Sequence, residues 1–375
     1  MPYKKIYINK KIKNKSVSKI VINNLPKGEL VYLNEQAVKN ILNTPKEKNL
    51  KDFSNSLFIT ENKGRFIKSC PGTTEYICCL YHILTLGFNC SLGCSYCILQ
   101  AYFKNPQLTI FANLDDMFQE LDIFFCKNPQ KFLRIGTGEF TDSLLLDRIT
   151  NFSAQLIPFF AKQNKAILEL KTKTTLIENL LDLNHKQKTF ISWSLNSPVI
   201  IKNEELFTSS LYNRLQAAKR CQDKGYPLGF HFDPIFYYPN WEKDYSETIN
   251  RLFDYINPKG VVWISMGCFR YMPELKQVIS TNYPNSKIIY QEFIDGMDKK
   301  KRYLKTVRIE IYKRIASWIR SIDKDILLYL CMESQEVWEK ALGIDLKSSE
   351  VLGKMLDLRA IQFSSLTRKG FADTI

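Results

Sequence analysis

Apolar runs of strand length alternate with amphipathic stretches along most of the middle of the chain. Nearly continuous apolar strands separated by helices are typical of β-α-β units that build a parallel sheet. Six such units are compatible with an open or partial α/β barrel and with a flat doubly wound sheet. The pattern predicts strands at 83–88, 132–138, 166–172, 189–196, 228–235 and 261–267, and helices at 114–125, 144–162, 175–182, 208–224 and 245–255.

The two ends of the chain have a different pattern. Residues 1–65 are rich in Lys and Asn and weakly periodic, and they predict a short strand at 18–23 and a helix at 35–42. The last hundred residues contain a long amphipathic helix, predicted at 302–320. We therefore expect an N-terminal extension (1–65), a barrel or sheet (66–275) and a C-terminal region (276–375) whose basic helix is a candidate nucleic-acid contact.

Composition narrows the class of protein. The 375 residues are 45% hydrophobic and 13% aromatic, which excludes a disordered chain, and no apolar run reaches the ~18 residues that a membrane span needs. The first residues are charged without an apolar stretch behind them, so we expect no secretory signal, a cytoplasmic location and no membrane partner. The net charge of +15 favours a polyanionic partner such as DNA, although a general Lys/Asn/Ile bias also explains part of it.

The cysteines are the strongest chemical signal. Six of the ten fall between positions 70 and 97, and in a chain without a secretory signal such a cluster is typical of metal binding or redox chemistry. Cys90, Cys94 and Cys97 have C-x3-C-x2-C spacing, which suits three corners of an iron–sulfur cluster. A zinc ion would need a fourth ligand, and the candidates are Cys78, Cys79 and His82. A redox-active dithiol is a further alternative.

Polar residues follow the predicted strands, where both barrels and open α/β sheets bind ligands. His231 ends the fifth strand and either contacts a ligand or makes a structural hydrogen bond. Arg270 follows the sixth strand and is a candidate substrate contact. The other polar clusters at strand ends are 137–142, 173–174, 194–197 and 268–271.

With an aromatic residue, Tyr96, before its last cysteine, the motif resembles the signature of the radical S-adenosylmethionine (SAM) superfamily. Within it, the chain from about Cys70 to Trp338 resembles the spore photoproduct lyase family. That resemblance implies a partial (β/α)6 barrel with N- and C-terminal extensions and a [4Fe–4S] cluster held by Cys90, Cys94 and Cys97. It also implies SAM on the open iron, reductive cleavage of SAM to a 5′-deoxyadenosyl radical, and repair of a methylene-bridged thymine dimer in DNA. The matching segments are Cys90–Gln100, Arg134–Asp142, Thr172-Lys173, Ser194–Asn196, Arg214–Ala218, Gly225–Gly229, Pro234, Trp241–Tyr245 and Arg302-Tyr303.

The resemblance also implies individual roles. Lys173 matches the residue whose ammonium approaches the SAM carboxylate, and Tyr96 matches a tyrosine that relays the radical. Arg302 matches a basic residue near the lesion and its phosphate. A reductant such as flavodoxin or ferredoxin is an implied partner. Three further positions match polar contacts to SAM, namely Ser194, Asn196 and Thr141.

Two positions depart from the family pattern. Glu139 stands where the family has its hydrogen-donating cysteine, and Ile98 replaces a second relay tyrosine. Because a carboxyl group is a poor hydrogen-atom donor, either another cysteine supplies the hydrogen or the scaffold acts on another substrate, such as a modified nucleotide, a metabolite or a peptide. In the second case Glu139 binds substrate or handles a proton. A non-catalytic nucleic-acid-binding protein is the third alternative. The candidate donors are Cys70, Cys78, Cys79 and Cys268.

Overall fold

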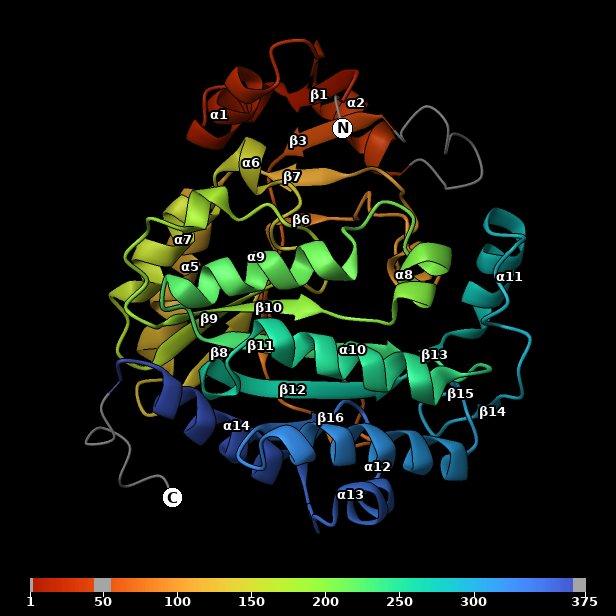
Figure 1. Cartoon of the computed structure of the whole chain (residues 1–375). Helices are drawn as coiled ribbons and strands as arrows, with labels where there is room; N and C mark the ends of the chain where they lie inside the picture. The colour runs from red at the N-terminus through yellow and green to blue at the C-terminus, as the bar shows by residue number, and fades with distance from the viewer. Residues whose placement is uncertain (1–2, 44–54, 367–375) are drawn as a thin grey trace.

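The computed structural model describes residues 3–43 and 55–366. In this part of the chain the strands form one eight-stranded, one five-stranded and one three-stranded sheet. Figure 1 shows the N-terminal elements at one end of the molecule and the large sheet, with its helices, beyond them. The expected α/β class is therefore confirmed.

The eight-stranded sheet is the frame of the molecule. Neighbouring strands are parallel, apart from the antiparallel pair at the β4 edge. The sheet is curved, and within the described residues its edge strands β16 and β4 do not pair with each other. It is therefore a partial barrel, as the family resemblance implied. Its order is β16 (Leu327–Leu330), β12 (Val261–Cys268), β11 (Leu228–Ile235), β10 (Thr189–Ser194), β9 (Ala166–Thr172), β8 (Leu133–Gly136), β5 (His82–Leu84) and β4 (Ile67–Ser69).

Helices cover the outer face of this sheet, with α9, α10 and α12 in front of the strands in Figure 1. The covering helices are α5 (Leu114–Lys127), α7 (Ser153–Ala161), α9 (Leu211–Asp223), α10 (Trp241–Tyr255), α12 (Lys305–Ile322) and α14 (Ser349–Phe363). Shorter helices lie in the connections: α4 (Leu99–Tyr102), α6 (Asp147–Thr150), α8 (Pro198–Glu204), α11 (Pro273–Asn282) and α13 (Gln335–Leu342), with 3-10 turns η3 (Glu178–Leu180) and η4 (Pro258–Gly260).

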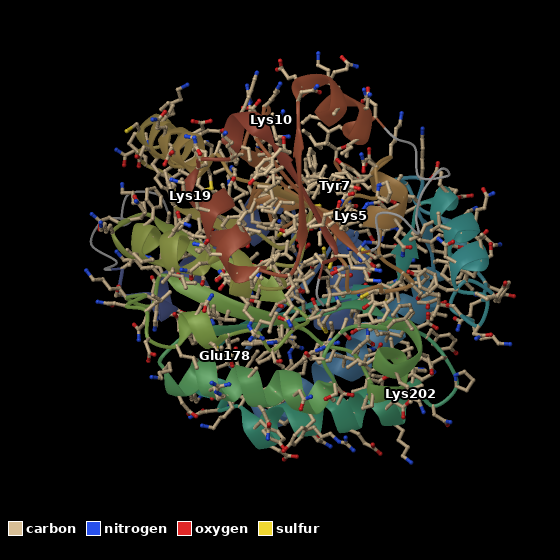
Figure 2. All side chains as sticks on the ribbon, turned by 90° about the horizontal axis from the view of Figure 1, so that it is seen from above. Lys5, Tyr7, Lys10, Lys19, Glu178 and Lys202 are labelled. Atoms are coloured by element: carbon tan, nitrogen blue, oxygen red, sulfur yellow. The ribbon has the colours of Figure 1, made fainter. Side chains whose placement is uncertain are left out.

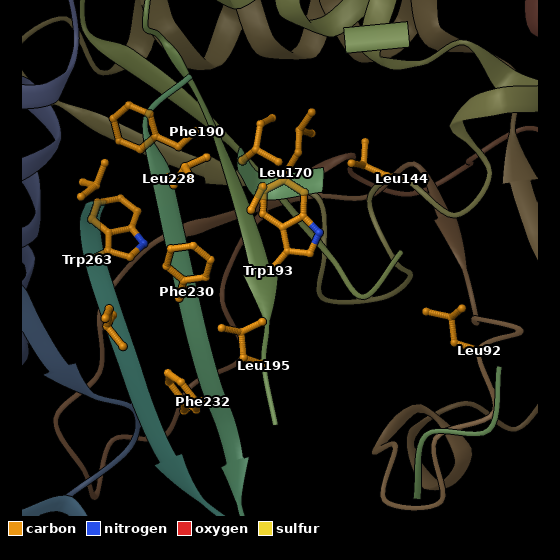
Figure 3. Close-up of a cluster of buried hydrophobic side chains, with 14 of the residues drawn as sticks. Leu92, Leu144, Leu170, Phe190, Trp193, Leu195, Leu228, Phe230, Phe232 and Trp263 are labelled. Carbon is orange, nitrogen blue, oxygen red and sulfur yellow. The ribbon is translucent and has the colours of Figure 1, made fainter. Parts of the chain in front are cut away.

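The two faces of the strands differ in polarity. Trp193 of β10 is aligned with Phe230 of β11, and both are fully buried in the apolar cluster that Figure 3 shows. Because successive side chains of a strand point to opposite faces, the next aligned pair, Ser194 and His231, points into the barrel. The sequence pattern predicted strands that are apolar on both faces. The inner face is instead partly polar, and it is this face that forms the site.

The N-terminal residues build the five-stranded sheet, whose order is β2 (Glu29–Leu33), β1 (Lys5–Asn9), β3 (Ser56–Thr60), β7 (Thr109–Phe111) and β6 (Gly87–Phe88). Helices α1 (Ser16–Asn24) and α2 (Glu35–Leu42) and the turn η1 (Lys10–Ile12) accompany it. Since β6 and β7 come after residue 65, the sheet extends past the expected end of the N-terminal extension. Figure 2 views this region from above, with Lys5, Lys10 and Lys19 on it, and all three are exposed.

The third sheet joins the end of the barrel to the C-terminal region. Its order is β13 (Arg270–Tyr271), β15 (Lys301–Arg302) and β14 (Ile294–Asp295), and all its pairs are antiparallel. It brings the basic segment 299–308 back to the end of β12. No helix among the described residues is long and apolar enough to cross a membrane.

Several predicted elements are wrong in detail. The strand predicted at 18–23 is part of helix α1, because Val17 and Val21 are four residues apart and bury the same helical face, which outweighs the strand propensity of β-branched residues. The helix predicted at 175–182 is only the 3-10 turn η3. The helix predicted at 144–162 is two helices, α6 and α7, separated by Asn151 in a left-handed conformation.

The strand predicted at 83–88 is also divided. Its first part is β5 in the barrel and its last part is β6 in the N-terminal sheet, so the cysteine motif follows a strand that belongs to the other sheet. Gly87 permits this crossing, because a Cβ there would stand 2.1 Å from the carbonyl oxygen of Thr109 on β7.

Candidate active site

One cavity of about 2470 Å³ opens at the mouth of the barrel. Its wall comes from the cysteine loop after β6, from the carboxyl ends of β8 to β12, and from the segments before β5 and after β16. The position agrees with the expectation that ligands bind where the parallel strands end. The cavity brings together many of the predicted site residues: Cys70, Cys90, Cys94, Tyr96, Cys97, Glu139, Thr141, Lys173, Ser194, His231 and Arg270.

The three motif cysteines share one part of the wall. Burial raises the pKa of Cys90 and of Cys94, and each of these thiols is also influenced by Cys97, so the three sulfurs are electrostatic neighbours. Among the described residues, no three or more Cys, His, Asp or Glu side chains are placed so that they could hold one metal ion. The three cysteines are therefore not arranged around a single ion, and no zinc site is formed with the proposed fourth ligands. Three adjacent soft thiolate donors on a loop facing a large cavity fit an iron–sulfur cluster with one open iron.

The cysteine loop is held from behind by the segment after α8. Cys94 forms a β-bridge with Glu205, and the Ser95 amide donates to the Glu204 carbonyl at 2.8 Å. The Ser95 hydroxyl also donates to the Glu204 carboxylate. The loop therefore has a fixed backbone conformation without depending on any bound group.

Tyr96 is buried, and its hydroxyl donates a hydrogen bond to Glu205. Arg214 pairs with the same carboxylate and also donates to the Ser194 carbonyl at 2.8 Å. Burial opposes the charged form of Glu205, but Arg214 and Lys173 outweigh it and lower the pKa of this carboxyl. A neutral phenol thus faces an ionised, fully paired carboxylate.

Lys173 extends from the end of β9 toward the cysteines, with its ammonium 5.9 Å from the centre of the Tyr96 ring. Burial opposes its charge, but Cys94 and Glu205 together raise its pKa, so it remains a cation. Asp142 accepts the Lys173 amide at 2.8 Å and thereby fixes the loop after β8 against the end of β9. The buried hydroxyl of Thr141, in the same loop, has no hydrogen-bond partner in the described structure. A cation and an unpaired hydroxyl in the wall of one cavity suit a ligand that carries a carboxylate and polar groups.

The other two residues expected near SAM have different surroundings. Ser194 lines the cavity. Asn196 is not part of its wall: its amide group donates to the Pro234 carbonyl at 2.9 Å and accepts from the Tyr245 hydroxyl at 2.5 Å. The expectation that Asn196 contacts SAM stays a prediction, and in this structure its side chain joins the ends of β10 and β11.

Glu139, Lys171 and Tyr81 together form another part of the cavity wall. The Lys171 ammonium pairs with the Glu139 carboxylate, and the Tyr81 hydroxyl donates to the same oxygen. Burial opposes the charge on Glu139, but Lys171 outweighs it and lowers the pKa of the carboxyl. Burial raises the pKa of the Cys70 thiol, and the negative charge of Glu139 raises it further. Cys70 is therefore an electrostatic neighbour of the Glu139 carboxylate.

A second carboxylate lies deeper inside the barrel. Glu169 of β9 accepts from His231 Nε2 at 2.9 Å, and the other ring nitrogen of His231 is 2.8 Å from the Ser265 hydroxyl. Burial opposes the charge on Glu169, yet His231 and Ser192 outweigh it and lower its pKa to about 2. The sequence left two roles open for His231, a ligand contact and a structural hydrogen bond. The structure shows the structural hydrogen bonds, and His231 also lines the cavity.

The basic residues predicted to contact substrate divide into two groups. Arg270 lines the cavity and pairs with Asp233 at 3.2 Å. Arg302 is buried behind the wall, where it pairs with Asp298 at 2.8 Å, donates to the Met332 carbonyl and stacks over the Tyr76 ring. The expected place of Arg302 near the lesion and its phosphate stays a prediction, and its guanidinium is paired within the protein in this structure.

The candidate hydrogen donors also separate. Cys70, Cys78 and Cys79 line the cavity, whereas Cys268 is buried outside it, and its backbone amide donates to the Tyr312 hydroxyl at 2.7 Å. Cys331, which the sequence analysis left without a role, lines the same wall and lies 3.3 Å from an Arg270 nitrogen.

Sequence reasoning missed Glu169, Lys171 and Tyr81. The first two had a signal, since two charged residues at alternate positions of an otherwise apolar strand (Ala166–Thr172) indicate one polar face. Tyr81 had none, because its contact with Glu139 joins residues that are 58 positions apart. Glu205 also lacked a local signal.

A partial parallel barrel with three cysteines and a lysine at its mouth is the arrangement of a radical SAM enzyme. A family model described as "Spore photoproduct lyase" matches residues 2–326. The chain is 28% identical over 282 residues to the spore photoproduct lyase of Bacillus subtilis strain 168, covering 73% of this chain and 78% of that protein. It is 27% identical over 235 residues to the enzyme of Clostridium acetobutylicum, covering 62% of this chain and 68% of that protein.

Solved structures agree with this assignment at the level of the fold. A spore photoproduct lyase mutant with dinucleoside spore photoproduct superposes with a TM-score of 0.78 at 21% identity, covering 88% of this chain and all of the other. A second mutant, with bound AdoMet and the same dinucleoside, gives a TM-score of 0.77 at 21% identity and the same coverage. The chain belongs to the spore photoproduct lyase family.

Proposed function

We propose that this chain is a radical SAM lyase that repairs a methylene-bridged thymine dimer in DNA. The observation that carries the proposal is the meeting, in one cavity, of the three-cysteine loop, the Lys173 cation and a polar wall around Glu139. Membership of the spore photoproduct lyase family supports the same reaction.

The first half of the cavity suits the cofactors. Cys90, Cys94 and Cys97 would hold the [4Fe–4S] cluster, and Lys173 would pair with the carboxylate of SAM. The Thr141 hydroxyl is the buried group that still lacks a partner, so it would gain one from SAM. When bound, the reduced cluster and SAM supply a 5′-deoxyadenosyl radical, which removes a hydrogen atom from the lesion.

The second half of the cavity suits a nucleotide substrate. Its basic wall residues and the net charge of +15 favour a polyanion. A lesion inside a duplex has to be turned out of the stack to reach an enclosed site, and a cavity of about 2470 Å³ has room for a dinucleotide. The wall cations are Lys131, Arg134, Lys171, Arg270, Lys300, Lys347 and Lys354.

Cys70 is the proposed hydrogen donor. Once the methylene bridge breaks, one thymine carries a carbon radical, and donation from Cys70 breaks the S–H bond, forms a C–H bond and leaves a thiyl radical. Burial raises the pKa of Cys70 and keeps the thiol protonated, as this step requires. Glu139 cannot take this role, because beside Lys171 it is an ionised carboxylate without a hydrogen atom to give.

A one-electron protein carrier of low potential, such as a flavodoxin or a ferredoxin, is the proposed reductant of the cluster. An enzyme that repairs DNA has to be in the compartment that contains the DNA, and we therefore keep the expected cytoplasmic location as part of the proposal.

The test uses the anaerobically reconstituted full-length chain. It should bind about four irons, cleave SAM to methionine and 5′-deoxyadenosine under reduction, and restore thymines in ultraviolet-irradiated DNA that contains the methylene-bridged dimer. Cys94→Ala should lose all three properties, whereas Cys126→Ala, on the exposed face of α5, should keep them. SAM cleavage without any repair by the unaltered chain would refute the proposed substrate.

A further inference from the structure

Several exposed apolar side chains belong to the cysteine loop or contact it. Ile98, which directly follows Cys97, is 40% exposed. Leu206 and Phe207, after α8, are 52% and 58% exposed. Phe207 lies against the loop, because a Cβ on Gly93 would come within 2.8 Å of its ring. Apolar side chains that gather at one place on a protein surface are typical of an interaction site.

The elements beside the loop form one face of the molecule. The Tyr283 hydroxyl, just after α11, donates to the Gln100 side chain of α4 at 3.2 Å. The Ser286 hydroxyl donates to the carboxylate of Glu204, the last residue of α8, at 2.8 Å. Figure 1 shows α8 and α11 on the same side of the barrel. The helices α4, α8 and α11, with the few residues that follow each of them, therefore lie together beside the cysteine loop.

The same elements carry exposed positive charge. Lys104 follows α4, Lys276 is on α11 and Lys287 follows α11, and all three are exposed. Glu274 of α11 is an exposed carboxylate on these elements, whereas the two glutamates at the end of α8 are buried. An apolar patch accompanied by positive charges is complementary to a partner with an apolar patch and negative charges, which steer the encounter.

The chemistry of the loop indicates the kind of partner. A [4Fe–4S] cluster held by the three cysteines needs one electron from outside for each cleavage of SAM. Because electron transfer slows steeply with distance, the donor has to dock close to the loop. Complexes of electron-transfer proteins have small interfaces, for which a few exposed apolar side chains suffice. DNA fits this face less well, since α4, α8 and α11, all within the described residues, contain no arginine, the side chain best suited to phosphate.

We propose that the face formed by α4, α8 and α11 is the docking site of a small acidic one-electron carrier protein. This inference rests on one part of the proposed function, namely the cluster on the cysteine loop and the cleavage of SAM. One electron leaves the carrier, which is oxidised, and enters the cluster, which is reduced, without transfer of a proton or a group. Ile98 and Phe207 form the apolar contact nearest to the cluster ligands, and the lysines attract the carrier.

The test measures SAM cleavage by the reconstituted full-length chain with two reductants, reduced flavodoxin and dithionite. Dithionite is a small ion that needs no docking face, so it separates docking from all later steps. Leu206→Glu/Lys287→Glu adds negative charge at two exposed residues that do not line the cavity. We expect the KM for flavodoxin to rise at least tenfold, with unaltered iron content and unaltered cleavage of SAM by dithionite.

The matched control is Ile123→Glu/Lys127→Glu, which makes the same changes of charge at exposed residues of α5. Figure 1 shows α5 on the other side of the barrel from α8 and α11, so this variant should keep the KM for flavodoxin. Added salt should raise that KM in the unaltered chain, because it screens the attraction between lysines and carrier, and should have less effect on the Leu206→Glu/Lys287→Glu variant.

Three results would overturn the inference. An equal loss of SAM cleavage with both reductants would show that the changes act on the cluster and not on docking. An unchanged KM for flavodoxin would remove the proposed contact, and weaker binding of duplex DNA in the same variant would assign the face to the substrate. Since the readout is SAM cleavage, failure of the unaltered chain to repair the thymine dimer overturns the proposed function alone.

Discussion

The Lys171 ammonium pairs with the Glu139 carboxylate on the inner wall of the barrel, in the cavity that the cysteine loop also lines. Both side chains are about three-quarters buried, so each charge depends on the other. The resemblance of the sequence to the family matches Glu139 to the position of the hydrogen-donating cysteine, so this pair is where we expect the chain to depart from its family.

Removing the cation should therefore destabilise the fold. Lys171→Met leaves Glu139 without its partner, and we expect the free energy of unfolding to fall by about 2 kcal/mol in urea titrations. Lys219→Met breaks an exposed pair with Asp223 on α9 and should cost at most about 0.5 kcal/mol. Equal losses for the two variants would show that the inner pair has no special weight.

The Lys173 cation should control the affinity for SAM. Lys173→Gln removes the charge that faces the cysteine loop, and we expect the Kd for SAM to rise about tenfold, equivalent to ~1.4 kcal/mol, with an unchanged iron content. Lys202→Gln, on helix α8 (Figure 2), is the matched control, because Lys202 is exposed. Isothermal titration under anaerobic conditions gives both affinities, and an unaltered Kd for Lys173→Gln would contradict the assigned role.

The position of the cysteines predicts which one returns the hydrogen atom. Cys70→Ala should lower the rate of repair about 100-fold, or ~2.7 kcal/mol, while SAM cleavage continues. Cys268→Ala should retain repair in the folded protein, because Cys268 is buried outside the cavity. If Cys70→Ala repairs at the unaltered rate, the donor is another group, and Cys78, Cys79 and Cys331 are the next variants to measure.

The Glu169 carboxyl should make the fold sensitive to acid. Its pKa is lowered from an ordinary value of 4.5 to about 2, so the ionised form contributes stability that is complete above pH 4.5 and is lost as the pH falls toward 2. Glu169→Gln should be less stable at neutral pH and show a flatter decline across this window. Parallel curves of unfolding free energy against pH for the two proteins would contradict the assignment.

The sequence allowed much of the fold to be predicted, because the strands of the barrel are long apolar runs. The bounds predicted for β9 and β11 agree with the structure, and those for β8, β10 and β12 differ by at most two residues at either end. The errors lie where one residue redirects the chain. Gly87 passes the strand at 83–88 from one sheet to the other, and no periodicity marks such a crossing.

The site was predictable to the extent that its residues are close in sequence. Cys90, Cys94 and Cys97 were visible as a motif, and strand ends pointed to Lys173. The Tyr81–Glu139 contact and the burial of Arg302 against Asp298 depend on tertiary packing, which sequence spacing does not encode. Arg302 shows the risk of reading charge as surface: a basic cluster at 299–308 contains two buried arginines, the other being Arg308, which pairs with Glu333.

The most direct measurement of the central claim is repair of a defined oligonucleotide, with a single methylene-bridged thymine dimer, by the reconstituted chain in deuterated water. The account predicts that both thymines are restored and that one methyl group carries a single deuterium, because the exchangeable hydrogen of the Cys70 thiol is the one returned. Cleavage of SAM with the dimer left intact, or repaired thymine without solvent deuterium, would contradict it.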